Sequence, residues 1–188
     1  MPTFLFGLPL HPLVVHAVVV LVPAAVIGGL LVALWPAVRA RRGVPVVVVA
    51  ALATISIPIA TSTGEGLERN LPPTPAMEIH TALGDQLLIF VAPLLVLVAG
   101  LVVLDRLRRN RRDEATTTAR RTGPGTMAAP RIRDSHARAG IVVLAVLTVA
   151  FAVASAVQVV RIGDSGARAA WGSVAYTPQA RHPGHPAD

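Results

Sequence analysis

Four of the six histidines, His11, His16, His80 and His136, are the side chains best suited to chemistry, because they lie within or at the ends of long apolar stretches. Ionisable groups inside a membrane are costly and frequently functional. The first two open the first apolar stretch and His80 opens the third, so we expect all three at one end of the molecule. His136 belongs to the opposite end, where no other helical histidine is expected, and is interpreted as a residue at the edge of a loop.

His11 and His16 cannot serve one ligand equally well. Pro12 marks the start of a helix, so His11 caps it and His16 lies roughly 6 Å deeper along the axis. Five residues also rotate the two side chains by about 140° around a regular helix, so that they point in different directions. We expect His16 to face the interior of a helix bundle and His11 to be a reserve ligand.

The residues after His80 favour a ligand site on the third stretch. Gly84 follows one turn later on the same helix face and leaves room for a flat ligand or a close helix. Asp85 is the sole carboxylate inside the apolar part of this stretch and is suited to orient an imidazole through a hydrogen bond. The polar run Thr61–Gly64 ends the second stretch at the same end of the molecule. Polar groups therefore gather at one end, which predicts a site there.

Three interpretations of this cluster stay open. Two neutral imidazoles from different helices are the ligand set of a b-type haem, held by His16 and His80 with His11 and Asp85 as further cofactor-binding residues. His16 and His80 would equally suit a zinc or copper ion. The histidines can also cap helices or bond carbonyl groups without any ligand, as in a non-catalytic membrane subunit or scaffold. No cofactor is assigned with certainty, no catalytic residue is identified, and an enzyme is not expected.

Charge depletion determines the class of protein that must position these residues. Charged residues make up 14% of the 188, hydrophobic residues 53%, and mean hydropathy is +0.63, whereas soluble domains are about 25% charged. A soluble globule is excluded. The absence of cysteine excludes disulfides and thiolate metal sites. Asp, Glu, Lys and Arg are absent from four stretches: Met1–Val38, Gly43–Gly64, Gln86–Leu104 and Ala139–Val160.

The expected fold is all-α, an integral membrane four-helix bundle, since each uncharged stretch can cross a hydrocarbon core of about 20 helical residues. Helices are predicted at about 12–35, 45–62, 79–104 and 139–160, within one transmembrane domain over 1–176. A flexible basic loop is predicted at 105–135 and a disordered tail at 177–188. No internal repeat is evident in the sequence.

Arginine predicts the orientation. Thirteen of the 17 basic residues, all of them arginine, lie in the first and third connections, and four lie elsewhere. Such an asymmetry indicates that these two connections are cytoplasmic and that both termini are extracytoplasmic. The expected partners are the lipid bilayer and, at the arginine-rich loops, anionic lipids. No nucleic-acid partner is expected, because no aromatic residues are interleaved with the arginines, and no protein partner is identified.

The chain resembles a bacterial membrane family known as domain of unknown function 2231. Three segments carry the resemblance: the opening His11-Pro12 with His16, the His80 start of the third helix with Gly84, and the ending Gly163-Asp164-Ser165-Gly166-Ala167 with Trp171. They extend over about Leu8 to Trp171. The resemblance implies a small multi-pass protein of the bacterial plasma membrane and implies no particular activity.

Overall fold

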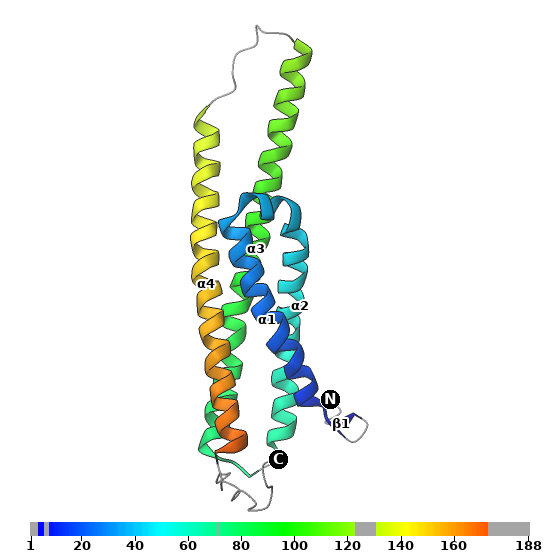
Figure 1. Cartoon of the computed structure of the whole chain (residues 1–188), viewed down its shortest axis with the longest axis vertical. Coiled ribbons are helices and arrows are strands. Elements are labelled where there is room, and N and C mark those ends of the chain that lie inside the picture. Colours follow the sequence, from blue (N-terminus) through cyan, green and yellow to red (C-terminus); the bar gives the residue numbers. More distant parts are fainter. Residues whose placement is uncertain (1–3, 6–7, 71, 123–130, 173–188) are drawn as a thin grey trace, which may run out of the picture.

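The computed structural model describes residues 4–5, 8–70, 72–122 and 131–172, with side chains over 11–70, 72–118 and 138–172. Its order is β1 (Phe4–Leu5), β2 (Leu8–Pro9), α1 (Leu10–Leu34), α2 (Pro36–Glu68), α3 (Pro75–Thr122) and α4 (Arg131–Trp171). The two short strands pair antiparallel before α1 begins. The helices form an elongated bundle in which α1 packs on α2, α2 on α3, α3 on α4 and α4 on α1 (Figure 1).

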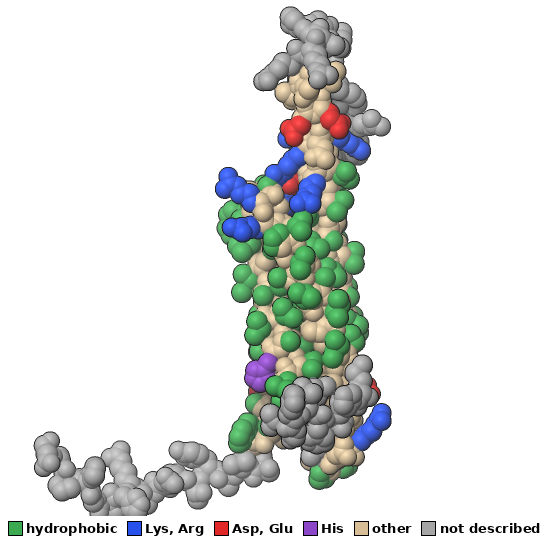
Figure 2. Space-filling view, turned by 90° about the vertical axis from the view of Figure 1, so that its right-hand side faces the viewer, with side chains coloured by type: hydrophobic (Ala, Val, Ile, Leu, Met, Phe, Trp, Pro, Cys, Tyr) green, Lys and Arg blue, Asp and Glu red, His purple; other side chains and the backbone are tan. Residues whose placement is uncertain are grey.

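All four helices are long and apolar enough to cross a membrane. The 25 residues of α1 extend about 37 Å at 1.5 Å per residue, slightly more than a hydrocarbon core of about 30 Å. Large apolar side chains cover the outside of the bundle, and most of the arginines visible in Figure 2 gather beyond one end of this apolar surface. An apolar exterior of this kind fits lipid and not water. The prediction of an all-α membrane bundle is confirmed.

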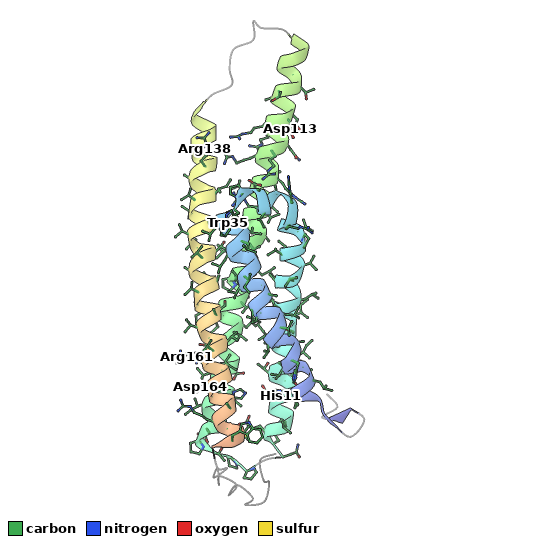
Figure 3. All side chains as sticks on the ribbon, in the orientation of Figure 1. His11, Trp35, Asp113, Arg138, Arg161 and Asp164 are labelled. Atoms are coloured by element: carbon green, nitrogen blue, oxygen red, sulfur yellow. The ribbon has the colours of Figure 1, made fainter. Side chains whose placement is uncertain are left out.

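The two ends of the bundle carry different chemistry and are named accordingly. At the histidine end α1 and α3 begin and α2 and α4 end, and Figure 3 places His11, Arg161 and Asp164 towards it. At the arginine end α1 passes into α2, and α3 and α4 extend beyond the other two helices (Figure 1). Trp35 and Arg138 lie towards this second end (Figure 3).

The first connection is shorter than predicted. Pro36 occupies the first turn of α2, where its missing N–H costs nothing, and Trp35 alone separates the two helices in an extended conformation. Pro45 therefore lies inside α2 and does not begin it. Figure 1 shows the first turns of α2 passing over the end of the bundle before the helix descends beside α1.

The prediction of a loop over 105–135 is wrong for most of that segment. Helix α3 continues to Thr122 and α4 already starts at Arg131. The stretch from Leu101 to Thr122 contains no glycine or proline, and extending an existing helix avoids the cost of nucleating one. A polar helix that projects from a bundle needs no apolar face, so its lack of apolar periodicity was misleading. The predicted tail 177–188 lies outside the described residues.

The bundle contains an internal repeat that the sequence analysis did not find. A shift of 69 positions takes His11 to His80 and takes six buried residues of α1 onto the six buried residues among the described side chains of α3. The pairs are Val18 with Leu87, Val22 with Val91, Ala25 with Leu94, Gly29 with Val98, Val32 with Leu101 and Ala33 with Val102. The two helices therefore bury the same face at the same depth.

Helices α2 and α4 repeat in the same way with a shift of 102 positions, which takes Thr63 to Ser165. Buried residues again match: Ala50 with Ala152, Ala53 with Ser155, Ser56 with Gln158 and Thr63 with Ser165. The larger shift reflects the longer connection between α3 and α4. The bundle is thus two helical hairpins, α1–α2 and α3–α4, that begin at the same end. Parallel repeats of this type are related by an axis along the membrane normal.

Candidate functional site: paired histidines at one end of the bundle

His11 ties the start of α1 to the end of α2. Its Nδ1–H donates to the carbonyl of Ala60 at 3.1 Å and lies 3.4 Å from the hydroxyl of Thr63. The Thr63 hydroxyl donates its own proton to backbone carbonyls of its helix, at 2.9 Å, so it acts as an acceptor towards the imidazole. A Cβ on Gly64 would lie 3.0 Å from His11 Cε1. The glycine therefore lets the imidazole lie directly against the backbone of α2.

His80 joins the start of α3 to α4 through the same three groups: a backbone carbonyl, a hydroxyl and a glycine. Its Nδ1–H donates to the Ile162 carbonyl at 3.2 Å, and the Ser165 hydroxyl lies 3.2 Å away. Ser165 donates in turn to Ile162 at 2.9 Å. A Cβ on Gly166 would lie 2.9 Å from His80 Cε1. In both hairpins the carbonyl, the hydroxyl and the glycine occupy the first, fourth and fifth positions of one helical segment.

We call these two arrangements half-sites: His11 with Ala60, Thr63 and Gly64, and His80 with Ile162, Ser165 and Gly166. In each, a backbone carbonyl can only accept a hydrogen bond, so the Nδ1 atom carries the proton of the neutral imidazole. The Nε2 atom then keeps its lone pair. Within the described part of the chain neither Nε2 atom has a hydrogen-bond partner.

The structure does not bring His16 into this arrangement, and the prediction that it faces the bundle is wrong. His16 is exposed on the outer surface of α1, and its Nδ1 atom bonds the Pro12 carbonyl of the same helix at 2.6 Å. His11 and His16 do point in different directions, as expected, but it is His11 that faces the interior. Packing determines this rotation of α1, because Val18, Val22 and Ala25 follow His11 on the buried face.

The structure also leaves the other predicted site residues outside the two half-sites. Asp85 is exposed and makes none of the hydrogen bonds to His11 or His80; carbonyl and hydroxyl oxygens orient the imidazoles instead. Gly84 is half-buried, and a Cβ built there would meet nothing within 4 Å, so open space adjoins α3 one turn from His80. The backbone of His136 belongs to α4, and its side chain lies outside the described set.

The described side chains do not support a metal site with three protein ligands. No group of three or more His, Asp or Glu residues converges among them. What the histidine end offers is two imidazole nitrogens, one from each hairpin. This suits a ligand that needs two nitrogen donors and no carboxylate.

A polar stripe on α4 was missed in the sequence. Thr148, Ser155, Gln158 and Ser165 are all buried, at spacings of 7, 3 and 7 residues that place them on one helix face. Gln158 Nε2 donates to the carbonyl of Leu83 at 2.8 Å and so joins α4 to α3 one turn from His80. The seven-residue spacing of Thr148 with Ser155, and of Gln158 with Ser165, was the pattern in the sequence that could have indicated this polar face.

A charged cluster at the arginine end was also missed. Arg39 of α2 is 5% exposed, and its Nε lies 3.5 Å from Asp105 of α3. Its Nη1 donates to the Val32 carbonyl near the end of α1 at 3.1 Å. Arg109 bonds the same Asp105 carboxylate and donates to the Pro36 carbonyl at 3.3 Å. One carboxylate thus joins the first hairpin to the second, and nothing equivalent occurs at the histidine end among the described residues.

Comparison with known proteins supports one assignment. No curated protein and no solved structure matches the chain. A family model described as a predicted membrane protein, DUF2231, matches residues 7–178 and therefore includes both half-sites and all four helices. The ending segment that carries the resemblance, Gly163–Ala167, contains the Ser165 and Gly166 of the second half-site. The chain belongs to the DUF2231 family of membrane proteins.

Proposed function

We propose that this membrane protein binds one metal-centred ligand at its histidine end, between His11 and His80, and that the ligand is a b-type haem used in electron transfer. The observation that carries the proposal is the pair of half-sites, in which both Nδ1 atoms bond the protein and both Nε2 lone pairs have no partner among the described residues. His11 replaces His16 as the first ligand considered, because His16 is exposed on the lipid-facing surface.

The chemistry of each half-site suits a histidine that would bind a metal centre. A histidine that binds a metal commonly donates its other N–H to a carbonyl or carboxylate, which fixes the tautomer and makes the coordinating nitrogen more basic. Ala60 and Ile162 supply such carbonyls. His11 and His80 would hold a b-type haem through their two imidazole nitrogens, and no carboxylate ligand would be needed. The haem would supply the redox chemistry, and the protein would orient and enclose it.

The helices that carry the two histidines are also suitably arranged. Helices α1 and α3 lie diagonally across the bundle and begin at the same end, so their first turns reach similar depth. The open space beside Gly84 adjoins this level. Cofactor sites of helical bundles are built from side chains on facing helices in this way.

We further propose that the arginine end faces the cytoplasm of a bacterial cell and that both termini lie outside the plasma membrane. The distribution of thirteen arginines against four supports this orientation. The haem would then lie in the outer leaflet, accessible to an extracytoplasmic electron donor or acceptor.

The test is an optical spectrum of the full chain, purified in mild detergent after haem-supplemented expression. We expect a Soret band and a reduced-minus-oxidised α-band in the wild type, and loss of both in His11→Ala and His80→Ala. His16→Ala is the matched control and should keep the spectrum. A wild-type protein without a Soret band, or variants that all retain it, would refute the haem proposal.

A second candidate is a non-catalytic membrane component in which the histidines only join helices. The observation that favours it is that each Nδ1–H already satisfies a carbonyl of the neighbouring helix. It predicts no bound metal by elemental analysis and a loss of thermal stability in His11→Ala and His80→Ala. Copper or zinc in stoichiometric amount, lost in both variants, would instead indicate the metal-ion alternative.

A further inference from the structure

The arginine end has far more positive than negative charge. Nine guanidinium groups with described side chains gather there against three carboxylates. The arginines are 39, 41, 42, 106, 108, 109, 111, 112 and 138, and the acids are Asp105, Asp113 and Glu114. Among the described side chains, Asp105 alone of these acids forms an ion pair, which it shares between two arginines. The described carboxylates therefore leave most of the charge of the nine arginines uncompensated.

Arg41 and Arg42 are the exposed members of this group that lie on α2. Both are exposed, and in the described part of the chain neither has an ion pair or a side-chain hydrogen bond. They lie in the first turns of α2, which pass over the end of the bundle (Figure 1). The contacts of Arg39 with Asp105 and of Gly43 with Val102 fix this part of α2 against α3. The two guanidinium groups are thus held on a rigid support.

The level of Arg41 and Arg42 is where the apolar exterior ends. Leu34 is 57% exposed, Trp35 52% and Val44 40%, so apolar side chains that face lipid flank the two arginines in sequence. Trp is enriched at the headgroup level of membranes, which places the phosphates of the adjoining leaflet near these guanidinium groups. Guanidinium binds phosphate by two parallel hydrogen bonds.

We propose that Arg41 and Arg42 form a binding surface for anionic phospholipid headgroups, with Trp35 beside it. This surface is independent of the histidine end and of any ligand there. Attraction of about 1 kcal/mol for each basic residue near an anionic surface corresponds to roughly a fivefold preference per arginine. The two together should favour an anionic over a zwitterionic lipid by roughly 25-fold, and added salt should weaken the preference.

The two tryptophans allow a direct test, since Trp35 and Trp171 mark opposite ends of the bundle. The full chain with Trp171→Phe, in vesicles containing either brominated phosphatidylglycerol or brominated phosphatidylcholine in both leaflets, reports on Trp35 alone. We expect stronger quenching by the anionic lipid, loss of that preference in Arg41→Gln/Arg42→Gln, and no loss in the control Arg161→Gln. A Trp35→Phe protein, which reports on Trp171, should show little preference.

Three results would overturn the proposal. Equal quenching of Trp35 by the two lipids would show that no anionic headgroup is selected there. An unchanged preference in the Arg41/Arg42 variant would place the selectivity elsewhere. Reversal by millimolar inorganic phosphate at constant ionic strength would identify a free-phosphate site and not a lipid surface. Because both arginines are exposed, the double variant should keep the wild-type melting temperature, which confirms that it is folded.

Discussion

The two ends of the bundle hold the same helices together by different means. At the histidine end each hairpin closes on itself through an imidazole, a carbonyl, a hydroxyl and a glycine, and the two hairpins do so identically. At the arginine end the first hairpin turns within one residue, Trp35, whereas α3 and α4 project outwards. There a buried ion pair joins one hairpin to the other. The polar contacts repeat between the hairpins at the histidine end, whereas the connections and the charged contacts at the arginine end do not, although the buried faces of α1 and α3 still match there.

This difference teaches where sequence change is tolerated. Hydrogen bonds between membrane helices contribute about 0.6 kcal/mol on average and seldom more than about 1.7. A buried charge left without its partner costs about 3–5 kcal/mol. The arginine end should therefore dominate stability, and the histidine end should matter more for ligand binding than for folding. The following predictions test this contrast, beginning with the largest effect.

Neutralising Asp105 should have the largest effect on stability. Asp105→Asn leaves Arg39, which is 5% exposed, without a counter-charge, and we expect a loss of about 3 kcal/mol in the free energy of unfolding. Denaturation of the detergent-solubilised protein by a graded increase in SDS measures it.

The control is Asp164→Asn, which breaks the exposed Asp164–Arg168 pair at 3.0 Å. Exposed pairs contribute about 0–1 kcal/mol, so this variant should stay close to the wild type. Equal losses at the two positions would contradict the proposed dominance of the arginine end.

The glycines of the half-sites come next. Gly166→Ala places a Cβ 2.9 Å from His80 Cε1, and Gly64→Ala places one 3.0 Å from His11 Cε1. Each imidazole must move, and we expect a cost of about 1–3 kcal/mol, less the gain of roughly 0.5–1 kcal/mol that alanine brings to a helix. Gly163→Ala, which meets nothing within 4 Å, should be neutral or stabilising. Thermal unfolding of the three variants compares them, and a stable Gly166→Ala protein would show that the imidazole is not tightly packed there.

The sequence was sufficient for the spans and for one half of the site. Charge-free windows are a global property of membrane helices, so four spans follow from counting charges. His80 and the Thr61–Gly64 run could be assigned to the same end because each adjoins the end of a span. The interior position of Thr63 against His11 could not be derived, because it depends on how two helices rotate against each other.

The choice between His11 and His16 failed for the same reason. One sequence gives their relative rotation of about 140° but not the phase of α1, which the packing of Val18, Val22 and Ala25 determines. The repeat escaped detection because the two hairpins share burial more than residue identity: Ala25 matches Leu94, and Ser56 matches Gln158. The few identical pairs are mostly valine and alanine, which are common throughout the chain, and only His11 with His80 and Gly64 with Gly166 are distinctive.

Removing the hydroxyls should have a smaller and equal effect in the two hairpins. Thr63→Val and Ser165→Ala each delete one oxygen near an imidazole, at about 1 kcal/mol per site. Since the half-sites share no residue, the losses should add in the double variant within about 0.5 kcal/mol. The carbonyl bonds to His11 and His80 remain, so a bound haem should be retained with an altered reduction potential. Strongly non-additive losses would show that the half-sites are coupled and do not act as independent units.

His16→Ala should have the smallest effect, although its histidine lies only five residues from His11. The imidazole is exposed and, among the described residues, bonds only Pro12 of its own helix, and alanine has the higher helix propensity. We expect a change within about 0.5 kcal/mol in unfolding free energy and no change in ligand content. A large loss would mean that α1 is rotated in the membrane so that His16, and not His11, faces α2. The match between the buried faces of α1 and α3 would then fail, and with it the equivalence of the two hairpins.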